Sequence, residues 1–425
     1  MHLLLRNCHV ISPAQNINGR FDIMIYNGVI IRMGIIWQHV RECIHYDLDG
    51  MIVAPGFFDM HVHFRDPGQT HKETISSGIN AAANGGITGV LMMPNTQPPV
   101  DNVKIISQNK LKAQNKIVDV YTAACATVKR EGKRLTDIES LVRHGALAVT
   151  DDGSPIENHF IMEEVLNMSS VLSVPIVQHC EFTSISDGGV INEGDVASKL
   201  GVKGIPNSAE YEMIERDIDL LRKYPRARYH VQHISTKESV ELVKRAKSEG
   251  LNISCEACPH HFILTEDAVL QYGTDAKMNP PLRKKEDVMA IKEGLKDRTI
   301  DVVCTDHAPH SQDEKSLGLE KAPFGIVGLE TSIALTYTYL VKTGVITLED
   351  MITKMSVNPR RLLGLPDIKI SEGEIANFTI LDLKNKWRID KKLFKSMSQN
   401  TPFNGWEVEC KPLGIVKAEK FQLKI

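Results

Sequence analysis

Eight short runs of β-branched or apolar residues recur through the middle of the chain, and helical-looking segments separate most of them. The runs are GFFDMHVHF, GVLMMPN, IVDVYTAAC, ALAVTDDG, VPIVQHCE, RYHVQHIS, NISCEACPHH and DVVCTDHAPH. One intervening segment, ESVELVKRAKSEG, repeats its apolar residues at near-helical spacing. Strands that alternate with helices form parallel βαβ units. Eight such units predict an α/β fold with a closed (β/α)8 TIM barrel, which needs about 250 residues.

The two ends of the chain have a different pattern. FDIMIYNGVIIRMG contains two strand-like runs joined at Asn27-Gly28, a strong signal for a two-residue hairpin. Near the C-terminus, GEIANFTILDL alternates apolar and polar residues and is followed by GIVKAEKFQLKI. We therefore predict that residues 1–55 and 366–425 together form a small β-sandwich domain, and that residues 56–365 form the barrel.

Composition narrows the class of protein. The chain has 425 residues, 42% of them hydrophobic, and a net charge of −3 with dispersed basic residues, so nothing favours nucleic acid or an anionic membrane surface. No apolar run approaches the roughly 20 residues of a membrane span, and the N-terminus has too short an apolar core for a signal peptide. The eight scattered cysteines fit free thiols in a reducing, cytoplasmic setting. We expect a cytoplasmic enzyme.

Most polar residues of the eight runs fall at the carboxyl end of a run. They are His61, His63, Asn95, Asp151, Asp152, His179, His233 and Asp306. Barrel enzymes build their active sites on the carboxyl-terminal rim, whereas packing gives no reason for core strands to end repeatedly in ionisable groups. The sequence therefore predicts an active site on this rim.

The histidines indicate a metal. His61 and His63 are two residues apart, so on a strand they face the same side, and two neutral imidazoles can bind zinc. His179 and His233 occur in the matching settings VQHC and VQHI. Each alone fits a hydrogen-bonded core histidine, and the His61 pair alone could lie on the surface. Four imidazoles on one rim favour a metal site instead.

Carboxylates complete the candidate ligands. Asp306 ends the eighth run, which lies beside the first when the barrel closes, and a carboxylate there can be both ligand and general base. Its alternative is a helix N-cap, but the following residues, HAPH, lack a helical apolar period. Either Asp151 or Asp152 can bridge two metals, the other being a cap or turn residue ahead of Gly153. The residues alone leave this choice open.

Three other features receive different interpretations. His230 lies three positions before His233, so the strand pleat turns it away, and we interpret it as structural. Cys255-x-x-Cys258 has no second half and lies inside a strand run, so we expect no separate metal site there. Arg65 follows a candidate ligand by two residues and suits bidentate binding of a substrate carboxylate better than a free surface position.

Longer motifs carry a family resemblance. The chain contains HVHFRDPG, HKET, MPNT, TDDG, KMNPPLR, DHAPH, APFGIVGLET and the late TPFNGW. Together they resemble dihydroorotases of the smaller bacterial type, members of the metal-dependent amidohydrolase superfamily, over essentially the whole chain. HxH alone marks only the superfamily, whereas DHAPH with KMNPPLR and MPNT is much more specific.

The resemblance implies a centre of two zinc ions and a set of substrate contacts. The implied zinc ligands are His61, His63 and Asp306 for the more buried ion, and His179 and His233 for the second. Many superfamily members bridge the metals with a carboxylated lysine on the fourth strand, whereas this sequence has VTDDG there, and aligning the motif makes Asp152 the bridge. The implied substrate contacts are His63, Arg65, Asn95, Asn279, His310, Phe324 and Gly325.

The implied reaction is the reversible cyclisation of N-carbamoyl-L-aspartate to L-dihydroorotate in de novo pyrimidine biosynthesis. Zinc would lower the pKa of a shared water toward about 7 and polarise the amide carbonyl. Asp306 would act as the general base that takes the proton of the water and delivers it to the leaving ring nitrogen. We also expect residues 310–325, HSQDEKSLGLEKAPFG, to act as a mobile lid.

Two other functions compete with this one. A hydantoinase, dihydropyrimidinase or allantoinase would share the barrel and the HxH motif, but these relatives usually carry the bridging lysine that is absent here. A non-catalytic scaffold for another pyrimidine enzyme would have lost metal ligands, and all six candidates are present. The residues leave open a homodimer and an association with aspartate transcarbamoylase.

Overall fold

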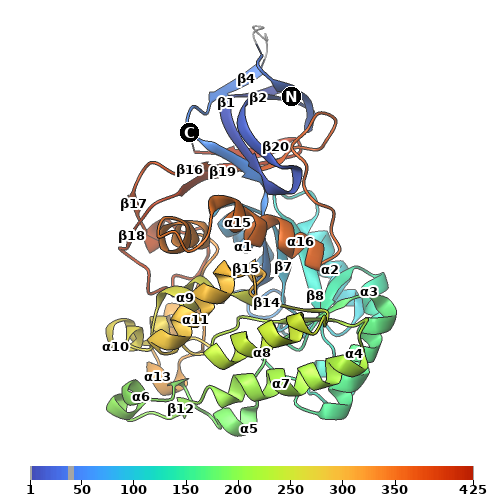
Figure 1. Cartoon of the computed structure of the whole chain (residues 1–425), viewed down its shortest axis with the longest axis vertical. Helices are drawn as coiled ribbons and strands as arrows, with labels where there is room; N and C mark the ends of the chain where they lie inside the picture. The colour runs from blue at the N-terminus through green and yellow to red at the C-terminus, as the bar shows by residue number, and fades with distance from the viewer. Residues whose placement is uncertain (1, 37–42, 425) are drawn as a thin grey trace.

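A computed structural model describes residues 2–36 and 43–424, which form a barrel beneath a sheet built from both ends of the chain (Figure 1). Eight parallel strands pair in the order β15-β14-β13-β10-β9-β8-β7-β6. They are β6 (Phe57–Val62), β7 (Ile87–Met92), β8 (Asp119–Ala124), β9 (Ala146–Val149), β10 (Pro175–Gln178), β13 (Arg228–Val231), β14 (Ile253–Ala257) and β15 (Val302–Val303). A bridge between Val62 and His307 joins the last strand region to the first. The predicted barrel is confirmed.

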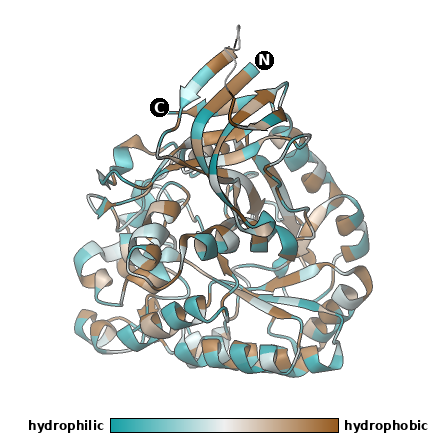
Figure 2. Cartoon of the chain, turned by 45° about the horizontal axis from the view of Figure 1, so that its top comes forward, coloured by the Kyte–Doolittle hydropathy of each residue, from teal (hydrophilic) through white to brown (hydrophobic). Residues whose placement is uncertain are grey.

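Amphipathic helices cover the outside of the barrel. The longer ones are α1 (Ile75–Asn84), α2 (Val103–Ala113), α4 (His159–Leu172), α7 (Ser208–Lys223), α8 (Lys237–Ser248) and α11 (Lys285–Lys296). In α8, Val240, Val243 and Ala246 are buried at three-residue spacing, while charged residues face outward. Hydrophilic and hydrophobic residues accordingly alternate along the outer helices (Figure 2). No helix of the described residues has the length and apolar character needed to cross a membrane.

Both chain ends contribute to one eight-stranded sheet, at the top of Figure 1. Its strands are β1 (His2–Ser12), β2 (Ile17–Tyr26), β3 (Val29–Gly34), β4 (Cys43–Asp47), β5 (Ile52–Pro55), β16 (Asn377–Asp382), β19 (Lys411–Lys417) and β20 (Lys420–Leu423). The hairpin between β2 and β3 turns at Asn27 and Gly28, which have φ values of 45° and 79°. β16 lies antiparallel to β5, with Phe378 opposite Pro55. The predicted β unit made from both termini is therefore present as one hydrogen-bonded sheet.

Strand β6 changes the direction of its side chains part of the way along. Phe58 and Met60 pack in the cluster that fills the barrel interior, whereas Val62 packs with residues of the barrel–helix interface. The pairing of β6 with β7 shifts register between Asp59 and Val62. A one-residue shift exchanges the two faces of a strand, and so His61 turns inward.

Asp59 stabilises this irregularity. Its Oδ1 accepts hydrogen bonds from the backbone N–H of His61 at 3.1 Å and of Thr305 at 3.2 Å. The carboxylate therefore fixes the bulged strand and ties it to the segment that follows β15. Burial raises the pKa of Asp59 to about 6, although these hydrogen bonds act in the opposite direction.

Candidate active site

A cavity of about 280 Å³ opens at the carboxyl ends of the barrel strands. Its lining consists of His63, Arg65, Asn95, Asp152, Gly153, His179, His233, Met278, Asn279, Asp306, Ala308, His310, Pro323, Phe324 and Gly325. Every residue predicted for the metal or substrate site belongs to this lining except His61. His61 is fully buried, and its Nε2 lies 3.4 Å from Asp306 Oδ1. The structure thus brings to one place the predicted residues that follow β6, β7, β9, β10, β13 and β15, together with those of the later loops.

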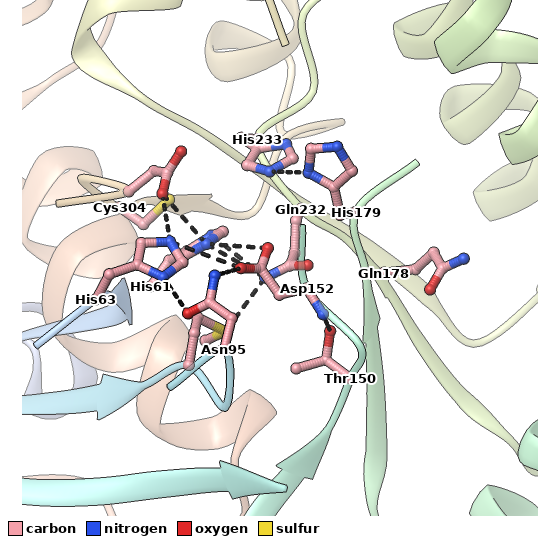
Figure 3. A network of polar contacts seen from close by, with 12 residues as sticks. His61, His63, Asn95, Thr150, Asp152, Gln178, His179, Gln232, His233 and Cys304 are labelled. Atoms are coloured by element: carbon pink, nitrogen blue, oxygen red, sulfur yellow. Dashed lines mark hydrogen bonds and ion pairs between the residues drawn. The ribbon is translucent and has the colours of Figure 1, made fainter. Parts of the chain in front are cut away.

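His61, His63, Asp152 and Asp306 form one side of the site, and Figure 3 labels the first three of them. Nε2 of His61 lies 3.5 Å from Asp152 Oδ1, and Nε2 of His63 lies 3.6 Å from Asp152 Oδ2. His63 Nε2 is also 2.8 Å from Asp306 Oδ1. Two ligand atoms at about 2.1 Å from a tetrahedral zinc ion are roughly 3.4 Å apart. The spacing and the chemistry of this donor set fit zinc.

Acceptors orient both imidazoles of this side. Glu256 Oε1 lies 2.6 Å from His61 Nδ1, and Asn95 Oδ1 lies 2.8 Å from His63 Nδ1. A carbonyl or carboxylate on Nδ1 leaves Nε2 as the free donor atom, which is the usual arrangement around protein-bound zinc. Asn95 also donates from Nδ2 to Asp152 Oδ2 at 3.1 Å. Both histidines therefore present Nε2 to the centre.

His179 and His233 form the other side. Nδ1 of His179 lies 2.9 Å from Nε2 of His233, and both histidines belong with Asp152 to a group whose possible ligand atoms lie within 4.8 Å of one another. His179 Nε2 contacts Glu181 Oε2 at 3.1 Å. Nδ1 of His233 is buried and has no hydrogen-bond partner among the described residues. This side can hold a second metal but is less firmly oriented.

The two neighbouring aspartates, Asp151 and Asp152, have different partners. Asp152 belongs to a possible ligand group on each side, one with His61 and one with His233. Asp151 instead accepts hydrogen bonds from the backbone N–H of Thr127 at 3.0 Å and from its hydroxyl. Asp151 is absent from the cavity lining. The geometry therefore favours Asp152 as the shared carboxylate.

The carboxylates of the centre are ionised. Burial alone would raise the pKa of Asp306, but His61 and His63 hold it well below its usual range. The pKa of Asp152 is lowered in the same way, with His61 again opposing the effect of burial. Burial and the neighbouring His179 lower the pKa of His233 to about 3, so this imidazole stays neutral. Burial alone would lower the pKa of His61 and of His179, but the nearby carboxylates raise both, so metal binding would release a proton from these imidazoles.

Three of the predicted residues adopt left-handed backbone conformations. The φ values are 56° for Arg65, 26° for His233 and 46° for Asp306. Residues other than glycine rarely adopt such angles, and they cluster at functional sites because the surrounding structure must hold them there. The backbone conformations thus point to the same cavity as the functional site that the side chains indicate.

The remaining predicted residues surround the mouth of the cavity. Arg65 Nη2 lies 3.2 Å from His310 Nε2, and Arg65 Nε donates to the Pro309 carbonyl at 3.3 Å. Asn279 donates from Nδ2 to Glu181 Oε2 at 2.8 Å. Basic and amide groups therefore line the same cavity as the histidines and aspartates.

The segment 310–325 is tied down by two buried lysines. Lys277 Nζ donates to the Ala322 carbonyl at 2.7 Å, and Lys315 Nζ donates to the Gly325 carbonyl at 3.1 Å. The Lys277 ammonium also lies 4.4 Å from the centre of the Phe324 ring. These contacts hold the wall of the cavity in place, and lid motion stays a prediction.

Two features lie outside the cavity lining. His230 is buried and contacts Ser254 Oγ at 2.7 Å and Glu256 Oε2 at 3.3 Å. Cys255 joins no possible metal-ligand group among the described residues, whereas Cys258 forms one with His260 and His261. Cys258 Sγ also lies 3.5 Å from Cys304 Sγ. Neither His230 nor Cys255 belongs to the lining.

Four contributing residues are absent from the sequence-based site. They are Lys72, Glu181, Glu256 and Asn400. Glu256 is a carboxylate inside an apolar strand run, and Glu181 follows His179 by two residues, so the sequence alone could have indicated both as site residues. Asn400 carried none: its amide donates to the Ala308 and Gly325 carbonyls at 3.0 and 2.9 Å, from a segment near the C-terminus.

Comparisons with known proteins agree with this geometry. A family model described as dihydro-orotase-like matches residues 50–239. The dihydroorotase of Acetivibrio thermocellus is 42% identical over 408 residues, covering 96% of this chain and 95% of the relative. The dihydroorotase of Wolbachia sp. subsp. Brugia malayi is 46% identical over 410 residues, covering 95% of this chain and 91% of the relative.

A solved structure supports the fold. The L-hydantoinase (dihydropyrimidinase) from Arthrobacter aurescens superimposes with a TM-score of 0.87 at 26% identity, covering 99% of this chain and 95% of that one. The similarity extends through the barrel and the terminal sheet alike. The sequence identity to curated relatives over nearly the full length is the stronger finding, and by it the chain belongs to the dihydroorotase family, a family of cyclic amidohydrolases.

Proposed function

We propose that this enzyme is a zinc-dependent dihydroorotase that interconverts N-carbamoyl-L-aspartate and L-dihydroorotate in pyrimidine biosynthesis. One observation carries the proposal: four histidines and two aspartates converge beside a cavity that Arg65 and His310 also line. Family membership supports the reaction, and the donor set supports the metal. The eight free cysteines support a reducing, cytoplasmic location.

The chain offers ligands for two zinc ions. His61, His63 and Asp306 would hold the more buried ion, His179 and His233 the second, and Asp152 would be shared. Bound zinc lowers the pKa of water and polarises a carbonyl group. Glu256 would keep His61 oriented and Asn95 would keep His63 oriented, since each accepts a hydrogen bond from Nδ1 of its imidazole.

Asp306 is the proposed general base. It lines the cavity and is ionised, because the neighbouring imidazoles hold its pKa low. In hydrolysis it takes a proton from the attacking water and delivers that proton to the ring nitrogen as the amide C–N bond breaks. In cyclisation it removes the proton from the ureido nitrogen that attacks the side-chain carboxyl, and it returns that proton to the carboxyl oxygen that leaves as water when the C–O bond breaks.

The mouth of the cavity would bind the substrate carboxylate. Arg65 is buried and stays cationic, because burial lowers its pKa only to about 10. A guanidinium can bind a carboxylate in bidentate fashion. Asn95, Asn279 and His310 line the same cavity and would contact the rest of the substrate, with Phe324 and Gly325 forming the wall.

A hydantoinase is the second candidate because of the structural likeness to the Arthrobacter enzyme. The fourth strand region has VTDDG where that kind of enzyme usually carries the bridging lysine. Uncharged hydantoin would also leave Arg65 without a carboxylate partner in a buried position, which is unfavourable.

The decisive experiment combines metal analysis with substrate comparison. We expect about two zinc ions per chain, turnover of L-dihydroorotate, and much slower turnover of hydantoin and allantoin. Removal of the metal with a chelator should abolish turnover, and added zinc should restore it. A metal-free protein with full activity, or a protein that turns over hydantoin faster than L-dihydroorotate, would contradict the proposal.

A further inference from the structure

The imidazole of His310 lies between two cationic side chains. Its Nε2 is 3.2 Å from Arg65 Nη2, and its Nδ1 is 3.3 Å from Lys72 Nζ. Both neighbours are hydrogen-bond donors without any acceptor. His310 and Lys72 are both buried, with 6% of each residue exposed. The ring thus has a cationic donor near each nitrogen and is largely shielded from water.

Only one of the two contacts can be a hydrogen bond. Burial, followed by the charges of Arg65 and Lys72, holds the pKa of His310 well below its usual range, so the ring is neutral. A neutral imidazole has one N–H and one accepting nitrogen. The other nitrogen carries the hydrogen, and the backbone carbonyl of Phe324, which also acts on this ring, can accept it.

The surroundings decide which nitrogen accepts. Lys72 Nζ is fixed by Glu314 Oε1 at 2.8 Å and lies outside the cavity lining, whereas Arg65 belongs to it. The other oxygen of Glu314 is 3.8 Å from His310 Nδ1, too far for a hydrogen bond, and already accepts from Ser311 N at 3.0 Å. Nδ1 thus has Lys72 as its hydrogen-bonding neighbour, while Nε2 faces Arg65 at the cavity.

We propose that Lys72 donates to His310 Nδ1 and so fixes the Nε2–H tautomer, which turns His310 into a hydrogen-bond donor beside Arg65 for the substrate carboxylate. Lys72 is then a positioning residue, held by Glu314 and acting through His310. The carboxylate, once bound, accepts from both Arg65 and His310 Nε2 and removes the donor–donor contact between them. The identity of that carboxylate rests on the proposed function, whereas the tautomer does not.

Nitrogen-15 NMR of histidine-labelled, zinc-loaded enzyme tests the tautomer directly. The His310 signals are assigned by their loss in His310→Gln. We expect Nε2 to show the protonated, pyrrole-type shift and Nδ1 the unprotonated, pyridine-type shift. The opposite assignment in the wild-type enzyme would overturn the proposal. In Lys72→Met the Nδ1–H form should appear, and an unchanged spectrum there would count equally against Lys72.

Kinetics test the consequence. Lys72→Met should raise KM for L-dihydroorotate by about tenfold to a hundredfold, the usual effect of losing a hydrogen bond to a charged group, with kcat within about twofold. Lys72→Arg keeps a donor and should recover most of the loss. The matched control is Lys354→Met, which removes a buried lysine that donates to the Ile300 carbonyl. It should leave KM unchanged at similar thermal stability.

The outcomes separate this inference from the proposed function. If the wild-type enzyme fails to turn over dihydroorotate but shows the expected tautomer and its loss in Lys72→Met, the assigned substrate is wrong and the role of Lys72 stands. If dihydroorotate is turned over and Lys72→Met leaves both KM and the His310 spectrum unchanged, the role of Lys72 is wrong.

Discussion

The two sides of the candidate metal centre differ in how firmly their histidines are held. On the first side, Glu256 contacts His61 and Asn95 contacts His63, each at Nδ1. On the second side, His179 and His233 face each other, and Nδ1 of His233 has no partner among the described residues. Both rings of the first pair are therefore oriented by an acceptor at Nδ1, whereas in the second pair only His179 has an acceptor, Glu181.

This difference bears on metal affinity. A ligand whose ring is already oriented loses less freedom on binding, and acceptors behind metal-bound histidines commonly change affinity tenfold to a hundredfold. Glu181 supports His179 from a position 13% exposed at its side chain, whereas the Glu256 side chain is 1% exposed. We therefore expect the first side to bind zinc more tightly than the second.

The largest expected effect concerns Asp306, the carboxylate that lies beside His61 and His63 on the first side. Asp306→Asn should lower kcat for dihydroorotate on the order of 10³-fold, because the amide cannot accept the proton of the attacking water. The chain should stay folded, as judged by circular dichroism and thermal unfolding. A variant within tenfold of wild type would remove Asp306 from its proposed role.

The carboxylate shared by the two sides comes next. Asp152→Ala should lose zinc and activity far more than Asp151→Ala, because only Asp152 has possible ligand partners on both sides. The zinc content and kcat of both variants should be measured together, so that each variant is the control for the other. The reverse ranking would move the bridge to Asp151.

A smaller effect tests the difference in orientation itself. Titration with a chelator should remove zinc in two steps, the first from the side of His179 and His233. Glu256→Gln should raise the zinc dissociation constant of the tighter step by about tenfold to a hundredfold. Glu181→Gln should raise that of the weaker step by less than about tenfold, since its carboxylate is better solvated. A larger effect from Glu181→Gln would reverse the proposed order of the sides.

The smallest effect concerns the segment 310–325. Hydrogen exchange of its backbone amides should slow when substrate binds, if the segment acts as a lid. The slowing should be modest, because Lys277 and Lys315 already tie its carbonyl groups to buried ammonium ions. Equal exchange and equal protease sensitivity with and without substrate would argue against lid motion.

The barrel and most of the site could be predicted because each depends on local pattern. Parallel strands buried on both faces form short apolar runs, such as Pro175–Gln178, where every residue is buried. The carboxyl end of each run then places its polar residues on the shared rim. His61, His63, His179, His233 and Asp306 were selected from this pattern, whereas Asn279, His310, Phe324 and Gly325 came from the family resemblance.

The rest depended on contacts between distant parts of the chain. Glu256 and His61 are 195 positions apart, and the sequence around neither residue predicts that the two will be in contact. The register shift in β6 follows from how Asp59 reaches the segment after β15. The choice of Asp152 over Asp151 depends on which side chain the loop turns toward Thr127. Such partners are set by tertiary packing, which periodicity does not record.

The terminal sheet has a consequence for biosynthesis. β5 lies between β1 and β16, and Pro55 pairs with Phe378. A ribosome adding 5–20 residues per second needs roughly 16 to 65 s to travel between these positions. Throughout that time one edge of β5 lacks its neighbour and is exposed to unwanted pairing. All the barrel strands are therefore synthesised while this edge of β5 still lacks its partner β16.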